Sequence, residues 1–143
     1  MGWESGRVWL EGDEIHCESY ICGDWSLPLS AIRVIGEYTN QNGPGVDDYF
    51  FAFVISLNEM WREASFYAEG RESFLAELRT RLGCECSCLL YASTDFRSRV
   101  WWPAELAGKE MFEFRQEDLM DKLKMRNRQY LSATVRGYLE QNT

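Results

Sequence analysis

Three cysteines at alternate positions are the residues of this chain whose type and spacing most suggest chemistry. They are Cys84, Cys86 and Cys88, in the stretch GCECSCLLY, and the chain has only five cysteines. Thiolates bind zinc, but a structural zinc site usually takes four ligands in two pairs, each pair separated by two to four residues. The Cys-x-Cys-x-Cys spacing lacks such pairs. A fourth ligand would have to come from the two other cysteines or from the single histidine, all near the N-terminus.

The same spacing is typical of a β-strand, in which every second side chain points to one face. A strand over 85–91 predicts that Cys84, Cys86 and Cys88 line up with Leu90. Same-face neighbours on a strand lie roughly 6.5–7 Å apart, which is too far for a disulfide, whose Cβ atoms lie about 3.8 Å apart. We therefore predict a buried row of free thiols. A metal or redox site is the alternative, and it would require these thiols to converge on the N-terminal cysteines or the histidine.

Other catalytic groups are sparse. The only histidine is His16, and the chain has no nucleophile elbow, P-loop, zinc-protease motif or glycine-rich dinucleotide turn. The neighbouring acids Asp47 and Asp48 lie in a predicted loop, where we interpret them as solvated charge. The sequence therefore predicts no catalytic residue, no cofactor and no metal. If the chain is an enzyme, its candidate residues are Cys88, Tyr91 and Asp47.

The elements that must position these residues follow from hydrophobic periodicity and turn signals. A hairpin over 8–17 turns at Gly12-Asp13, and residues 39–48 form a loop rich in Gly, Asn and Pro. Pro28 makes residues 25–29 an edge or a strand entry. Further strands are predicted at 31–38, 49–56, 61–68, 85–91, 98–102 and 111–115. Strands in hairpin succession favour an α+β fold with one bent, mostly antiparallel sheet of about seven to eight strands. At 143 residues the chain is predicted to form a single domain, 1–143.

Two helices complete the predicted fold. Over 71–82, Phe74 and Leu78 belong to one apolar stripe, and Gly83 is the expected helix stop. A long C-terminal helix is predicted over 117–140, with acidic residues at its start, where they favour the helix dipole. Its stripe is interrupted by an asparagine and its last turn is weakened by a glycine.

Charge is unevenly distributed along the chain. The formal net charge is −8; residues 1–70 hold 12 acids against 3 bases, whereas residues 71–143 hold 11 acids against 12 bases. Nucleic-acid binding needs basic side chains to displace counterions, so we expect no nucleic-acid partner. No apolar run reaches the roughly 18 residues of a membrane helix, and no basic start precedes an apolar run as in a signal peptide. We therefore expect a cytoplasmic protein for which a membrane partner is unlikely.

The candidate interaction residues are aromatic and basic. Half-buried sheets leave some of their large aromatics exposed, and exposed aromatics that cluster mark interfaces. The basic residues lie within the predicted C-terminal helix, where they offer a dock for an acidic partner, including self-association with the acidic half of a second copy. The candidates are Trp9, Trp61, Trp101, Trp102, Lys122, Lys124, Arg126 and Arg128.

Residues 7–83 resemble bacterial pleckstrin-homology-like domains. The resemblance lies in the rhythm from GRVWLEGDEIHC through SLPLSAIRVIGEY to FYAEGRESFLAELRTRLG: a short hairpin, paired strands, then a helix. It implies a curved antiparallel sheet capped by a helix, and a non-enzymatic module that binds phosphoinositides, peptides or proteins. The chain departs from the family because strands and a second helix follow. The family's lipid pocket is basic, whereas the corresponding region here has four acids against Arg7 alone.

These observations favour a non-enzymatic protein-interaction module that binds a basic protein partner through its acidic N-terminal half. An immunity-like inhibitor, a compact acidic chain that plugs a basic toxin, is the narrow form of this prediction. Two alternatives stay open. One is a small-molecule-binding protein or enzyme with a pocket between the sheet and the C-terminal helix. The other is a membrane-surface lipid-binding module.

Overall fold

The computed structural model describes residues 2–41 and 46–141 and shows an α+β fold built from three antiparallel sheets. Short 3-10 turns lie at Gly2–Ser5, Leu29–Ala31 and Ala104–Leu106. The predicted loop at 39–48 includes 42–45, which lie outside the described residues. Among the helices of the described part, none has the length and apolar character needed to cross a membrane.

The N-terminal sheet has the order β1-β2-β3. Its strands are β1 (Arg7–Glu11), β2 (Glu14–Glu18) and β3 (Trp25–Pro28). The predicted hairpin is confirmed, and Leu10 pairs with Ile15 beside its turn. Alternate side chains of β1 and β2 are buried, as expected when only one face of a sheet packs on a core. Pro28 lies on an edge strand, where its missing N–H costs no ladder bond.

The second sheet has four strands in the order β6-β5-β4-β7. They are β4 (Val34–Thr39), β5 (Tyr49–Val54), β6 (Arg62–Ser65) and β7 (Arg97–Trp102). Every residue of the two inner strands is buried. The strand predicted at 49–56 is apolar on both faces, which indicates an inner position, and the run YFFAFV forms such an inner strand because both faces of this sheet are covered.

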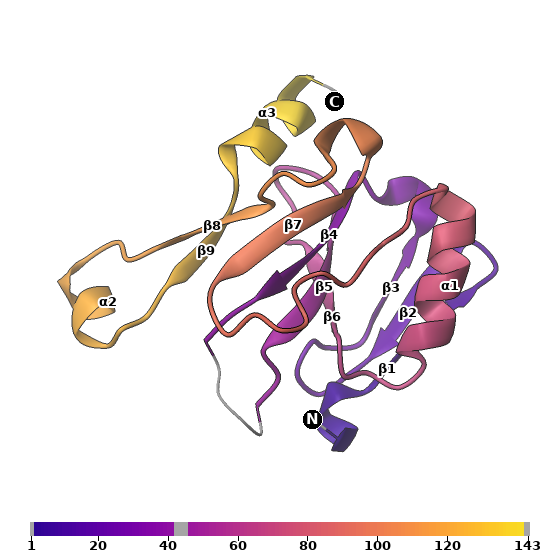
Figure 1. Ribbon diagram of the computed structural model, residues 1–143, viewed down its shortest axis with the longest axis horizontal. Coiled ribbons are helices and arrows are strands. Elements are labelled where there is room, and N and C mark those ends of the chain that lie inside the picture. Colours follow the sequence, from indigo (N-terminus) through magenta and orange to yellow (C-terminus); the bar gives the residue numbers. More distant parts are fainter. Residues whose placement is uncertain (1, 42–45, 142–143) are drawn as a thin grey trace.

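Two hydrophobic cores cover the two faces of the four-stranded sheet. The main core lies between this sheet, the N-terminal sheet and α1 (Arg71–Leu82), and includes Phe53 and Phe74. The helix spans the range predicted from its apolar stripe and ends at Gly83. The second core, on the opposite face, includes Phe50 and residues of the C-terminal segment. Figure 1 shows α1 beside the N-terminal sheet and the C-terminal segment at the other side of the molecule.

Gly36 allows β4 and β7 to approach closely. The register between these strands shifts between Ile35 and Gly36. A Cβ atom at position 36 would lie 2.5 Å from the Arg99 carbonyl oxygen and 2.6 Å from Met111 Sδ. Such contacts are far inside the van der Waals range, so only glycine fits at this bulge.

The prediction of a single bent sheet is corrected in two places. The strands form three separate sheets, and residues 83–96, which include the predicted strand at 85–91, form a loop between α1 and β7. The stretch is attached instead by its backbone to side chains of the sheet, with Leu90 N bonded to Glu37 of β4 and the Ser87 carbonyl oxygen to Trp101 of β7.

The prediction of one long C-terminal helix over 117–140 is wrong. The chain instead forms β8 (Phe112–Arg115), α2 (Leu119–Leu123), β9 (Arg128–Leu131) and α3 (Ala133–Gln141). Strands β8 and β9 pair antiparallel, and α2 connects them. We name residues 112–131 the arm. Figure 1 shows the arm extending from the four-stranded sheet, with α2 at its outer end.

Local chemistry explains why no long helix forms. The Asp118 side chain accepts a hydrogen bond from Asp121 N at 2.8 Å and caps α2, so the acidic start of the predicted helix is real. Met125, with a φ of 52°, then leaves the helical region and turns the chain back. Tyr130 and Leu131 pair with β8, so these two apolar residues of the predicted helix belong to a strand.

Candidate functional site

The three alternate cysteines lie in the loop after α1. Cys86 has a φ of 45°, which is incompatible with an extended strand, and its side chain is 2% exposed in the main core. Cys84 and Cys88 pack against the same core with partly exposed side chains. Of the three predicted buried thiols, only Cys86 is therefore fully buried; Cys84 and Cys88 are half-buried, and a loop rather than a strand places them against the core. Because the strand is absent, its spacing no longer separates them, and Cys84 Sγ lies 3.0 Å from Cys86 Sγ.

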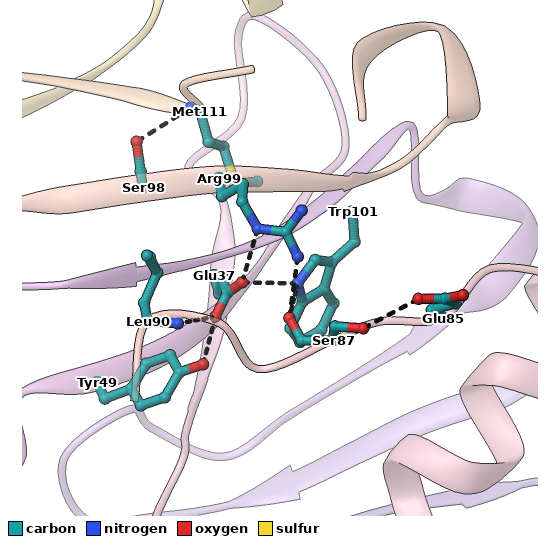
Figure 2. Close-up of polar contacts among 9 residues, drawn as sticks. All are labelled: Glu37, Tyr49, Glu85, Ser87, Leu90, Ser98, Arg99, Trp101 and Met111. Carbon is teal, nitrogen blue, oxygen red and sulfur yellow. Dashed lines mark hydrogen bonds and ion pairs between the residues drawn. The ribbon is translucent and has the colours of Figure 1, made fainter. Parts of the chain in front are cut away.

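Glu37 holds this loop on the four-stranded sheet (Figure 2). Its Oε1 atom accepts a hydrogen bond from Leu90 N at 3.3 Å. Beside it, the Ser87 carbonyl oxygen accepts from Trp101 Nε1 at 3.0 Å and from Arg99 Nη2 at 3.0 Å. Two loop residues are thus attached to side chains of β4 and β7. The segment that suggested chemistry is positioned by a buried carboxylate.

The carboxylate of Glu37 has donors on both oxygens. Its side chain is fully buried, and Tyr49 Oη donates to Oε1. Trp101 Nε1 donates to Oε2 at 2.9 Å, and Arg99 Nε, 3.2 Å away, supplies the compensating positive charge. Burial and Glu37 itself raise the pKa of Tyr49, so the phenol stays protonated as a donor. Because protein groups occupy both oxygens, this cluster is built for positioning rather than for proton transfer to a ligand.

In the predicted strand 31–38, apolar Val34 and Tyr38 alternate with Glu37, which indicates a half-buried strand with Glu37 on its polar face, and this interpretation is wrong. Both faces of β4 are covered, so the polar row of the strand also lies inside. Its partners Tyr49, Arg99 and Trp101 are 12, 62 and 64 residues away in the chain. No local pattern in the sequence could have joined them.

The cysteine thiols are in environments that favour the protonated form. Burial raises the pKa of Cys17 to about 12 and that of Cys22 to about 12. Burial also raises the pKa values of Cys86 and Cys88. Thiolate is the nucleophile and the metal-binding species, so these sites disfavour both roles. Within residues 2–41 and 46–141, no group of three or more His, Cys, Asp or Glu side chains is placed to hold a metal ion.

The acidic pair Asp47 and Asp48 is engaged in structural hydrogen bonds. Asp47 is 1% exposed, and its Oδ2 accepts from Ser5 Oγ at 2.8 Å and Ser65 Oγ at 2.5 Å. Tyr67 Oη donates to Asp48 Oδ1 at 2.6 Å. The interpretation of Asp47 as solvated charge is therefore wrong. Its carboxylate connects the N-terminal turn to the end of β6.

The outer face of the N-terminal sheet is the most distinctive exposed surface. We name it the acidic face; its residues are Arg7, Trp9, Glu11, Glu14, His16 and Glu18. The half-buried Trp9 lies at its centre, stacked on His16 with ring centroids 5.3 Å apart and planes at 14°. The Arg7 guanidinium lies 4.6 Å from the Trp9 ring and pairs with Glu18 at 2.7 Å. The stacked rings of Trp9 and His16 therefore form an aromatic platform on this surface, which we name the Trp9 platform.

Two glutamates face each other across this surface. Glu11 and Glu14 are direct cross-strand partners in the hairpin, and both are exposed. Like charges directly opposite each other on a sheet are destabilising. Asp13 adds a third carboxylate at the turn, where Arg81 of α1 pairs with it at 2.6 Å. The hairpin thus concentrates negative charge beside Trp9.

The other candidate tryptophans differ in exposure. Trp101 is 4% exposed and donates to Glu37, so it offers no surface to a partner in this fold. Trp102 is partly buried against the main core. Trp61 is half-buried, donates to Glu63 Oε2 at 3.1 Å, and has its ring centroid 4.7 Å from that of Phe112. Of the four candidate tryptophans, Trp101 is therefore excluded as a contact residue, whereas Trp9, Trp61 and Trp102 keep partly exposed side chains.

Grooves lie on either side of the base of the arm. One of about 340 Å³ and another of about 460 Å³ share Met60, Trp61 and Gln129 as lining residues. Arg136 of α3 also lines the first, and Glu63 the second. A larger groove of about 800 Å³ between β7 and β8 is lined by three arginines and three acidic side chains. Its mixed charge favours no single class of ligand.

The four basic candidates lie at the outer end of the arm rather than along one long helix. Lys122 lies in α2, and Arg128 is the first residue of β9. Arg126 and Arg128 turn inward to the carboxylate of Asp121, with Nε–O distances of 2.7 Å each. Lys122 and Lys124 are exposed. Of the four basic candidates, the two arginines therefore have a structural role, whereas the two lysines are exposed to solvent.

Comparison with known proteins finds no matching family model, no matching curated protein and no matching solved structure. The function must therefore be argued from the geometry of these surfaces.

Proposed function

We propose that the chain is a non-enzymatic protein-interaction module that binds a basic protein partner through the acidic face. The observation that carries the proposal is the exposed like-charge pair Glu11 and Glu14, at direct cross-strand positions beside the Trp9 platform, with His16 Nε2 3.8 Å from Glu14 Oε1. A like-charge pair at direct cross-strand positions lowers stability, and local rules are most often broken at functional sites. A partner that inserts Lys or Arg between the two carboxylates would relieve their repulsion.

The composition of the face suits such recognition. Large aromatics supply much of the affinity in protein interfaces, whereas peripheral charges mainly accelerate association and select the partner. Trp9 can provide the affinity, and the surrounding carboxylates can accelerate association and select a basic partner. An immunity-like inhibitor of a basic toxin is the narrow form of this proposal.

The order of elements also supports the proposed likeness to pleckstrin-homology-like domains over residues 7–83. Strands β1 to β6 are antiparallel and come before α1, which packs beside β1. Such a scaffold presents sheet surfaces and loops to partners. The acidic hairpin favours a protein partner over the anionic lipids that basic pockets of such domains bind.

Affinity capture with matched charge variants tests the proposal. The tagged wild type is compared with Glu11→Lys on the face and with Glu77→Lys, which makes the same change on an exposed position of α1. We expect one basic protein to be recovered by the wild type and by Glu77→Lys, and to be depleted about tenfold or more with Glu11→Lys. Equal recovery by both variants would refute a role for the acidic face.

A second candidate function, small-molecule binding, is favoured by the groove of about 460 Å³ that combines Trp61 with the carboxylate of Glu63. Mixed aromatic and polar linings are typical of ligand sites. A ligand screen that follows Trp61 fluorescence tests it. Hits whose signal disappears in Trp61→Phe but persists in Trp9→Phe would support this function, and hits unaffected by Trp61→Phe would argue against it.

A further inference from the structure

The outer end of the arm exposes four large apolar side chains. Leu119 is 68% exposed, Met120 49%, Leu123 69% and Met125 80%. They come from α2 and the turn that follows it, at the point farthest from the sheets in Figure 1. Large apolar side chains that gather at the surface mark an interaction site. We name Leu119, Met120, Lys122, Leu123, Lys124 and Met125 the arm tip.

A buried carboxylate holds the arm tip in one conformation. Asp121 is 0% exposed; its Oδ2 accepts from Glu117 N at 2.8 Å and Arg128 Nε at 2.7 Å, and its Oδ1 from Arg126 Nε at 2.7 Å. Met125 adopts a φ of 52°, which is uncommon for a residue other than glycine and strained for a long side chain. An internal ion network and a strained residue thus present apolar side chains to solvent. This arrangement preorganises a binding surface.

The arm tip is positively charged. Residues 119–128 carry four bases against one acid, and the two arginines are used by Asp121, so Lys122 and Lys124 remain at the surface. The rest of the chain is strongly acidic. A surface that complements the arm tip is therefore acidic and partly apolar.

Such a surface exists on the same chain, next to the N-terminus. Trp3 and Tyr20 are each 77% exposed and their ring centroids lie 5.6 Å apart, while Ile21 is 40% exposed. Ile21 N donates to the Glu4 carbonyl oxygen, which brings the exposed Glu4 side chain beside this group. Asp24, also exposed, accepts from the backbone of the same turn through one carboxylate oxygen. We name these five residues the N-terminal patch.

We propose that the chain associates with a second copy of itself, the arm tip of each copy docking on the N-terminal patch of the other. The apolar side chains of the tip would cover the Trp3–Tyr20 pair, and Lys122 and Lys124 would face Glu4 and Asp24. Two such contacts related by a two-fold axis form a closed dimer. This inference uses surfaces outside the acidic face and does not depend on the proposed function.

Sedimentation velocity of the full chain tests the association. We expect a reversible monomer–dimer equilibrium between about 1 and 500 µM, because the contact is smaller than a standard interface. Raising salt from about 0.05 to 0.5 M shortens the screening length and should raise Kd several-fold. Leu123→Asp should raise Kd at least about tenfold, since it removes an apolar contact and adds a charge like those of the patch.

A charge exchange identifies the partner surface. Lys124→Glu and Glu4→Lys should each weaken dimerisation, whereas the double variant, in which the charges face each other again, should restore it. Lys109→Glu makes the same change at an exposed site outside both surfaces and should leave Kd unchanged. Circular dichroism verifies that each variant folds.

Three results would overturn the proposal. One is a monomer at all concentrations, and another is a dimer that Leu123→Asp leaves intact. The third is a double variant no better than the single ones, which would place the arm tip on a different surface. Flotation of the monomeric wild type, but not of Leu123→Asp, on vesicles of phosphatidylcholine and phosphatidylglycerol would assign the tip to a membrane instead.

Discussion

Replacing Glu37 with glutamine should destabilise the fold more than any other single charge removal considered for this chain. The substitution keeps the shape of the side chain but removes its charge and turns one acceptor oxygen into a donor. In the native cluster, Tyr49 and Leu90 donate to one oxygen, and Arg99 and Trp101 to the other. An amide nitrogen in place of Oε1 would leave the Tyr49 hydroxyl and Leu90 N without this acceptor. In place of Oε2 it would leave Arg99 Nε without one, because Trp101 Nε1 also donates to the Ser87 carbonyl oxygen.

The expected loss follows from the geometry. A buried donor without a partner costs about 1–3 kcal/mol, so one or two of them cost about 1–6 kcal/mol. Breaking a buried ion pair by removing one partner costs about 3–5 kcal/mol, which agrees. We therefore expect Glu37→Gln to lower the free energy of unfolding by about 4 kcal/mol, a large share of the 5–15 kcal/mol typical of domains. Tyr49→Phe removes one donor and should cost only about 1–2 kcal/mol.

Urea unfolding followed by tryptophan fluorescence and circular dichroism measures both losses. Glu18→Gln is the matched control, because it makes the same chemical change in the exposed ion pair with Arg7 and should cost at most about 1 kcal/mol. A loss below about 1 kcal/mol for Glu37→Gln, or one equal to that of Glu18→Gln, would refute the reasoning that this carboxylate organises the fold.

Three further predictions concern other parts of the structure. Gly36→Ala should lower stability by at least about 2 kcal/mol in thermal unfolding, because the added methyl meets a backbone oxygen of the neighbouring strand. Mild oxidation with diamide should join Cys84 to Cys86, detected as the loss of two hydrogen masses in the peptide that contains both and abolished by Cys86→Ser. The Arg128 hydrogen bond holds the pKa of Asp121 well below its usual range, so the stability that this carboxylate contributes is present above about pH 4 and is lost as pH falls toward the lowered pKa. The difference in melting temperature between wild type and Asp121→Asn should accordingly be full at pH 7 and shrink below about pH 4.

Local patterns in the sequence predicted the elements whose contacts are also local. The hairpin over 8–17 was indicated by its turn residues and alternation, and the helix over 71–82 by its apolar stripe and Gly83. The inner strand over 49–56 was indicated by apolar residues on both faces. Each of these signals lies within a window of a few residues.

The errors arose where distant contacts decide local structure. The stretch 85–91 alternates like a strand, but backbone bonds to the side chains of Glu37 and Trp101 hold it as a loop. The segment 117–140 has a helical composition, but β9 finds its partner in β8 and ends the helix early. Single-sequence periodicity cannot weigh such competing pairings.

The candidate surface was predicted in part. Trp9 and the acids of the hairpin were recognisable from their types, and the structure brings them together on one face. The cross-strand pairing of Glu11 with Glu14 required the hairpin register. The arm was not foreseen, because its exposed apolar residues have the spacing of a buried helix stripe.

Binding through the acidic face is tested by the variant Glu11→Lys when stability and binding are measured on the same sample. We expect opposite effects. The free energy of unfolding should rise by up to about 1 kcal/mol, because a like-charge pair with Glu14 becomes an opposite-charge pair, and affinity for the captured basic partner should fall about tenfold or more. Such a trade-off is expected where a surface is selected for binding. If Glu11→Lys binds the partner as well as wild type does, the acidic face is not the binding surface, whatever the stability of the variant.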